Sequence, residues 1–172
     1  MNLAKISATF IATALAVLVL SSCGWTPRGV THDLPPDKSF AIVAKRGDSR
    51  VATLVGRLMA QYNIRVATDI SAADYQVVIL SEDSKLRTAS LNARARVAEY
   101  QVIYEAKAQL FDRDGALLME TDDLESSQFY EFDENDALAS QNERVRVENL
   151  ALNSLANQIL RALDQHFNAN SP

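Results

Sequence analysis

The chain has 172 residues, and its 17 lysines and arginines are outnumbered by 22 aspartates and glutamates, which gives a formal net charge of −5. An acidic balance argues against a nucleic-acid-binding protein, because that binding depends on neutralising phosphates. The single cysteine excludes an internal disulfide and a metal site built from several thiolates.

The N-terminal segment has the pattern of a secretory signal. One cation, Lys5, precedes an uncharged and mainly apolar run from Ile6 to Leu20. Its 15 residues fall short of the roughly 20 that span a bilayer. The run ends in Leu-Ser-Ser-Cys, which matches the lipobox of bacterial lipoproteins, so we expect residues 1–22 to be cleaved off and Cys23 to carry a covalent N-acyl and S-diacylglycerol lipid. A plain signal peptide or a membrane anchor is the alternative.

Residues 23–38 form a predicted tether, since they contain three prolines and two glycines. The residue after Cys23 is Gly24, whereas an aspartate there tends to hold bacterial lipoproteins in the inner membrane. We therefore expect lipid anchoring at the periplasmic face of the outer membrane. Residues 39–172 are then one domain, because the 150 residues left after cleavage suit one core and not two.

The first predicted elements of this domain are a strand and a helix. Ser39–Lys45 is short, apolar and flanked by turn formers, which is typical of a buried strand. Apolar residues recur with the helical period over Arg50–Tyr62. Asp48 or Ser49 is placed to cap this helix, and Asn63 to end it.

Two strands are predicted next. One begins at Tyr75 and either ends at Leu80 or continues past Ser81–Ser84 to Leu91. The other covers Ala98–Leu110, where apolar and polar side chains alternate with a period of two. This second strand therefore has one apolar and one polar face.

A hairpin turn and two further elements complete the domain. Asp112–Gly115 ends in Asp-Gly, a strong hairpin signal. It predicts an antiparallel strand over Ala116–Tyr130, with a bulge or a shift of the exposed face near Thr121. No proline or glycine interrupts Ala137–Phe167, where apolar residues keep the helical period. The acidic turn before this last helix supplies its cap.

The element order is β-α-β-β-β-α, which predicts a two-layer α+β sandwich. Two helices are expected on one face of a four-stranded, mostly antiparallel sheet. The other face of that sheet then stays free to meet a partner.

The residues predict neither catalysis nor a resident metal. His32 lies in the tether and His166 near the end of the last helix, so neither has the acid and the nucleophile beside it that enzyme triads require. Asp112–Gly115 resembles the start of a calcium loop, but the positions of the further ligands hold leucine and methionine. The acids around Asp133 are best explained as a solvated turn that caps a helix. We therefore expect no cofactor apart from the covalent lipid.

Three arginines gather near the predicted turn between the two long strands: Arg87, Arg94 and Arg96. Guanidinium groups bind phosphates through two parallel hydrogen bonds, and phosphates flanking acyl chains describe lipid A. The alternative is a solubilising surface, which is the commoner role of exposed arginines.

Several motifs resemble one family. The expected mature chain opens with Cys-Gly-Trp at 23–25 and Pro-Arg-Gly at 27–29, which looks like the opening of the lipopolysaccharide-assembly lipoprotein family LptE. Ala-Glu-Tyr at 98–100 is similar to the head of that family's long strand. Phe-Asp-Glu-Asn at 132–135 with Ala-Leu-Ala at 137–139 is similar to its acidic turn and the start of its final helix. The resemblance spans the mature chain.

The resemblance implies a non-enzymatic protein that plugs the lumen of the outer-membrane β-barrel LptD, helps it assemble and aids delivery of lipopolysaccharide to the outer leaflet. It also implies lipopolysaccharide binding by basic residues near the turn between the long strands and just after the Ala-Leu-Ala segment. Ala93 occupies the first of these positions, with Arg94 beside it, and Ser140 the second, with Arg144 one turn on. Ser140 is not carried over as a contact. The candidate lipopolysaccharide-binding residues are Arg87, Arg94, Arg96 and Arg144.

The alternative function is an envelope lipoprotein that scaffolds another transport complex or binds a small solute. Copurification of a large β-barrel would favour the plug. A small molecule held in a closed pocket would favour the alternative.

Overall fold

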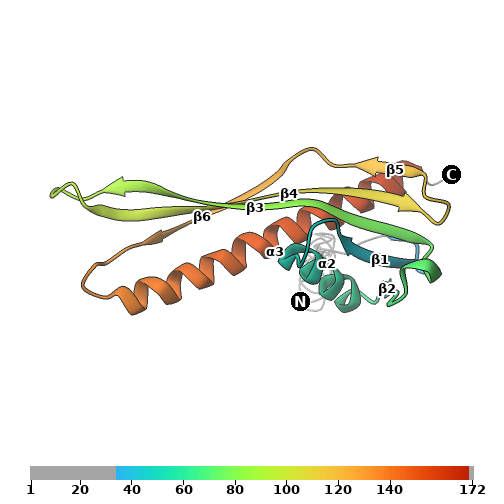
Figure 1. Ribbon diagram of the computed structural model, residues 1–172, viewed down its shortest axis with the longest axis horizontal. Coiled ribbons are helices and arrows are strands. Elements are labelled where there is room, and N and C mark those ends of the chain that lie inside the picture. Colours follow the sequence, from blue (N-terminus) through green and yellow to red (C-terminus); the bar gives the residue numbers. More distant parts are fainter. Residues whose placement is uncertain (1–33, 171–172) are drawn as a thin grey trace, which may run out of the picture. The chain divides into compact units, whose positions relative to one another are not determined.

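The computed structural model describes residues 34–170, and the expected signal peptide, the expected lipidation site Cys23 and most of the predicted tether lie outside this range. Within this range, six strands form one sheet, and two α-helices lie against one face of it (Figure 1). The elements are β1 (Ser39–Ala44), α2 (Arg50–Gln61), β2 (Arg65–Val66), the short 3-10 helix η1 (Ile70–Ala72), β3 (Tyr75–Leu91), β4 (Val97–Asp112), β5 (Leu117–Glu120), β6 (Leu124–Glu131) and α3 (Ala137–Ala169).

The sheet differs from the expected one in the number and direction of its strands. Its order is β2-β1-β3-β4-β5, and β6 also pairs with β4. β1 runs parallel to β2 and β3, whereas every pair that involves β4 is antiparallel. The predicted four-stranded, mostly antiparallel sheet is therefore corrected to a mixed sheet of six strands. β2 was not predicted, because a strand of two residues is too short to show the alternation of apolar and polar side chains.

The strand predicted over Ala116–Tyr130 is two strands, β5 and β6, separated near Thr121. The Thr121 N–H donates to the carbonyl of Ala108 at 2.9 Å, and Thr121 Oγ1 accepts from the Ala108 N–H at 3.0 Å. A side-chain oxygen thus replaces a backbone carbonyl in the ladder. The irregularity expected here is confirmed, and it is strong enough to end one strand and begin another.

Polar caps fix the N-termini of both helices. Ser49 precedes α2 in an extended conformation, and its Oγ accepts from the Ala52 N–H at 2.9 Å. Asp136 caps α3 by accepting from the Ala139 N–H at 3.0 Å. Asn63 lies beyond the end of α2 with a left-handed φ of 60°, as expected of a residue that ends a helix.

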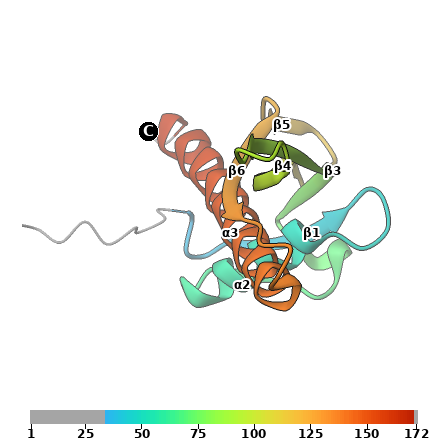
Figure 2. The same cartoon turned by 90° about the vertical axis from the view of Figure 1, so that its left-hand side faces the viewer.

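The core lies between α2, α3 from Val147 to Leu163 and the sheet around β1. Figure 2 shows both helices on the same side of β3 and β4. The largest fully buried side chains include Phe40, Met59, Leu110, Leu152, Leu155, Ile159, Leu160 and Leu163. The first turns of α3 lie beside the end of β6, and Leu138 there is 74% exposed. The tip of the β3–β4 hairpin and the start of α3 thus form an end of the domain that is far less buried than its body.

Candidate functional site

The tip of the β3–β4 hairpin displays two of the four candidate arginines. Asn92 builds this turn, because its N–H donates to the carbonyl of Arg96 at 2.8 Å while its Oδ1 accepts from the N–H groups of Arg94 at 2.9 Å and Arg96 at 3.1 Å. Ala95 completes the turn with a φ of 57°. Both arginine side chains are exposed. The sequence indicated the arginines but not the asparagine that positions them.

An acidic turn between β6 and α3 holds one of these arginines. Arg96 forms an ion pair with Glu134 of that turn. The turn itself is fixed, since the Asp133 N–H donates to Ser140 Oγ at 2.9 Å and the Asn135 N–H donates to Asp133 Oδ1 at 2.8 Å. Ser140 is only 6% exposed. It therefore supports the turn, which explains an uncharged residue at this position.

The four candidate arginines do not converge on one point. Arg87 lies on β3 opposite Gln101 of β4. Arg144 lies on α3 beside Tyr100, the neighbour of Gln101 in β4. Because successive strand residues point to opposite faces of a sheet, Arg87 lies on the face away from the helices and Arg144 on the helix face. Arg94 and Arg96 lie between them at the tip.

Arg144 borders a small hollow with an aromatic floor. The hollow has a volume of about 170 Å³ and is lined by Leu86, Tyr100, Tyr130, Phe132, Ala137, Ser140, Gln141 and Arg144. The rings of Tyr100 and Tyr130 stack with centroids 5.6 Å apart, and Phe132 meets Tyr100 edge-on at 5.4 Å. Glu148 accepts a hydrogen bond from Arg144 Nε at 2.8 Å, which raises the pKa of the guanidinium. A fixed cation beside apolar rings suits an anionic amphiphile.

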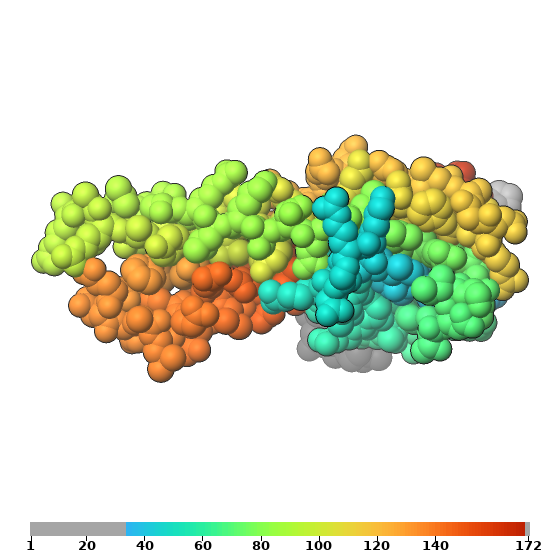
Figure 3. Space-filling model, viewed as in Figure 1, coloured from blue at the N-terminus to red at the C-terminus, as the bar shows by residue number. Residues whose placement is uncertain are grey.

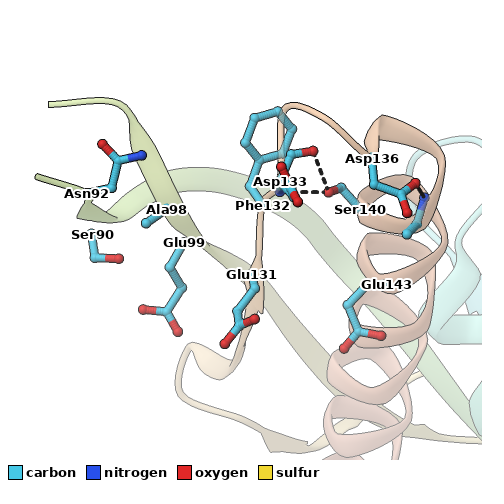
Figure 4. A pocket seen from close by; sticks show the side chains of 11 residues that line it. Ser90, Asn92, Ala98, Glu99, Glu131, Phe132, Asp133, Asp136, Ser140 and Glu143 are labelled. Carbon is cyan, nitrogen blue, oxygen red and sulfur yellow. Dashed lines mark hydrogen bonds between the residues drawn. The ribbon is translucent and has the colours of Figure 1, made fainter. Parts of the chain in front are cut away.

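A larger groove at the same end is acidic. It lies between the hairpin tip, the end of β6 and the start of α3, with a volume of about 590 Å³ (Figure 4). Its acidic lining residues are Glu99, Glu131, Asp133, Asp136 and Glu143. Even so, the structure of residues 34–170 contains no group of acidic, histidine or cysteine side chains that could hold a metal ion. This concentration of carboxylates repels phosphates, so an anionic ligand is expected to bind outside the groove.

Glu82 of β3 helps to cap α2, which the sequence pattern did not predict. Its Oε2 accepts from Ser49 Oγ at 2.5 Å and from the Val51 N–H at 3.1 Å. A strand side chain thus satisfies a backbone donor of the first helical turn. This contact joins the start of α2 to β3 at the point where β3 leaves the body of the domain.

A polar cluster beside this cap reaches α3. Arg50 donates to the Tyr104 hydroxyl at 3.1 Å and forms an ion pair with Glu148 at 3.7 Å. Burial, and then the charge of Glu148, raises the pKa of Tyr104. Since Glu148 also binds Arg144, the cluster holds that candidate arginine to the body of the domain.

Three other features considered in the sequence are the lipidation site, a membrane-spanning segment and His166. Cys23 lies outside residues 34–170. Of the helices in that range, none combines the length and the hydropathy needed to cross a membrane. His166 lies near the end of α3 and contacts the ring of Phe167 with centroids 5.4 Å apart.

Comparison with known proteins identifies relatives of this fold. The family model LptE, described as lipopolysaccharide assembly, matches residues 37–163. Lipoprotein B from Nitrosomonas europaea superposes with a TM-score of 0.71 at 22% identity, with coverage of 85% of this chain and 94% of that one. The rare lipoprotein B from Shewanella oneidensis has a TM-score of 0.63 at 18% identity, with coverage of 77% and 99%. At these identities the solved structures establish the fold alone. No curated protein matches the sequence.

Proposed function

Because this chain belongs to the LptE family of lipopolysaccharide-assembly proteins, we propose that it is an outer-membrane lipoprotein that plugs an LptD-like β-barrel, helps it assemble and aids delivery of lipopolysaccharide to the outer leaflet. The family match over residues 37–163, which covers most of the folded domain, is the observation that carries this proposal. The lipobox supports it, since a lipid on Cys23 would hold the domain at the membrane that contains such a barrel.

The helix-free face of the sheet is the surface that we assign to the barrel wall. It is polar and charged, and two ion pairs lie on it, Lys85 with Glu105 at 2.6 Å and Lys107 with Glu120 at 2.6 Å. The interior of a membrane β-barrel is polar. A polar, charged face therefore suits such a wall better than an apolar one would.

Lipopolysaccharide phosphates are assigned to the hairpin arginines, and first to Arg87 and Arg94. No ion pair within residues 34–170 engages either side chain. Arg96 and Arg144 already bind Glu134 and Glu148. A phosphate must compete with those carboxylates, so we expect smaller contributions from these two arginines.

Binding of purified lipopolysaccharide to the full mature chain tests this assignment. The double variant Arg87→Glu, Arg94→Glu should weaken binding by at least about tenfold, because charge-assisted hydrogen bonds are lost and repulsion is added. The matched control is Arg161→Glu, an exposed arginine of α3 that lies about 36 Å along the helix from its first residue. Unchanged affinity in the double variant would exclude these two arginines from the site.

Affinity purification from detergent-extracted envelopes tests the barrel assignment. A plug should copurify with one large β-barrel in a constant ratio. Recovery of other transport subunits without a barrel would favour the alternative, a lipoprotein that scaffolds another transport complex.

A further inference from the structure

One edge of β3 has no pairing strand over most of its length. β1 pairs with β3 only as far as Ile79, where the Lys45 N–H donates to the Ile79 carbonyl at 2.9 Å. β3 continues to Leu91 with β4 on its other side (Figure 1). Within residues 34–170, no backbone hydrogen bond joins another segment to the second edge of β3 beyond that point.

The register shows which backbone groups face this free edge. On the far side of β4, Ala98 accepts from Phe132 and Ala108 bonds with Thr121. Because successive strand residues direct their N–H and C=O groups to alternate sides, the odd-numbered residues of β4 bond toward β3. Their partners in β3 are Ser81, Asp83, Lys85 and Arg87. The intervening residues therefore direct N–H and C=O to the free edge, and they are Glu82, Ser84, Leu86 and Thr88.

A groove lies at the start of this edge, where β1 leaves the sheet. It has a volume of about 250 Å³, follows β3 from Ile79 to Ser84 and is bordered by Arg46 and Asp48 of the loop into α2. Figure 3 shows this loop, in cyan, beside the light-green arm of the hairpin. A strand that continued the line of β1 would begin in the groove and pass along the free edge, so the space and the unpaired backbone groups coincide.

The side chains along the edge indicate the chemistry of a partner. On the face away from the helices, Lys85 is already paired with Glu105. The remaining charges along the edge and near the groove are the cations Arg87, Lys45 and Arg46 and the anions Asp83 and Asp48, so the balance is positive by one. On the helix face, Leu86 is 44% exposed. Opposite charges and pairs of apolar side chains stabilise neighbouring strands. We propose that an extended segment of a partner protein, with acidic and apolar side chains in alternation, adds to β3 as a further strand.

Amide hydrogen exchange in the full mature chain tests this pairing. The probe is a peptide of about ten residues that alternates glutamate with valine. Without peptide, the amides of Ser84, Leu86 and Thr88 should exchange fast, while those of Lys85 and Arg87 are slowed by β4. Saturating peptide should slow the first three by at least about tenfold. Peptide binding that leaves these three amides unchanged would overturn the proposal.

A substitution on the same edge separates strand pairing from charge attraction. Ser84→Pro removes one edge N–H without touching the bonds to β4, and it should weaken peptide binding by about tenfold. Ser84→Ala keeps the N–H and should bind as the unaltered chain does. Equal binding by the two variants would contradict strand addition.

Two variants of the peptide cover the case in which Ser84→Pro does not fold. A peptide methylated on alternate backbone nitrogens should not bind, and a peptide with lysine in place of glutamate should bind more weakly. Binding of either at the original affinity would overturn the proposal. So would a dimer of this chain that is lost in Ser84→Pro, because the edge would then belong to a second copy.

Discussion

The first turns of α3 and the rest of that helix have different surroundings. In the C-terminal half, Leu155, Ile159 and Leu163 are fully buried in the cluster that includes α2 and the sheet. In the first turns, before the buried Val147, Leu138 is 74% exposed and Val145 is 46% exposed. One helix thus joins a packed body to an end made of the hairpin tip, the end of β6 and its own first turns. Stability therefore resides in the body, while the candidate ligand groups lie on the end.

The largest expected effect comes from truncating the body. Leu155→Ala should lower the free energy of unfolding by about 2–5 kcal/mol, because it leaves a cavity in the core. Leu138→Ala is the matched change on the same helix, and it should stay within about 0.5 kcal/mol of the unaltered chain. Urea denaturation measures both. Similar losses for the two variants would remove the distinction between body and end.

A smaller effect is expected where the two regions meet. Glu82→Ala should cost about 1–2 kcal/mol, because the Val51 N–H and the Ser49 hydroxyl lose their acceptor. Asp83→Ala, the exposed neighbour, should cost little. If thermal unfolding shows the same midpoint for both variants, the hydrogen bonds from α2 to Glu82 contribute nothing to the stability of the domain.

A change at the hairpin tip should slightly stabilise the chain. Ala95 has a φ of 57°, a conformation that glycine adopts without the steric cost of a Cβ atom. Ala95→Gly is therefore expected to gain about 0.5 kcal/mol. Ala93→Gly, at a position without positive φ, should lose a few tenths. A loss in Ala95→Gly, measured by urea denaturation, would contradict the left-handed turn.

The smallest predicted effect is a pH dependence in the body. The N–H and then the hydroxyl of Ser39 donate to the Asp74 carboxylate, at 2.9 and 2.8 Å, and hold its pKa below the ordinary value. This stabilisation is complete above the ordinary aspartate pKa of about 3.9 and is lost as pH falls through the lowered one. Asp74→Asn should thus be less stable than the unaltered chain at neutral pH, and the gap should close in acid. A difference in the free energy of unfolding between Asp74→Asn and the unaltered chain that grows below about pH 4 would contradict this prediction.

Much of the fold could be predicted from local pattern. The helical periods, the Ser49 cap and the family resemblance are confirmed, and β3 is one strand of 17 residues through Leu91. β2 and the parallel direction of β1 could not be predicted, because a two-residue strand has no period and direction depends on distant pairing.

The candidate site could be predicted only in part. Local composition indicated the arginines near the hairpin tip. The long-range contacts around the site could not be predicted. Glu134 lies 38 residues from Arg96, and Glu82 lies 33 residues from Ser49 along the chain. The periodicity of apolar residues along the chain carries no information on contacts between residues so far apart in sequence. The opposite faces occupied by Arg87 and Arg144 follow only from the observed register and from the position of α3.

Photo-crosslinking in intact cells tests the proposed plug most directly. Single photoreactive residues would be placed at exposed positions on the free face of the sheet, the hairpin tip and both halves of α3. We expect nearly all of these positions to crosslink to the same large outer-membrane β-barrel, since a lumenal protein is surrounded by its partner. Crosslinks confined to one face, or formed mainly with other envelope proteins, would contradict it.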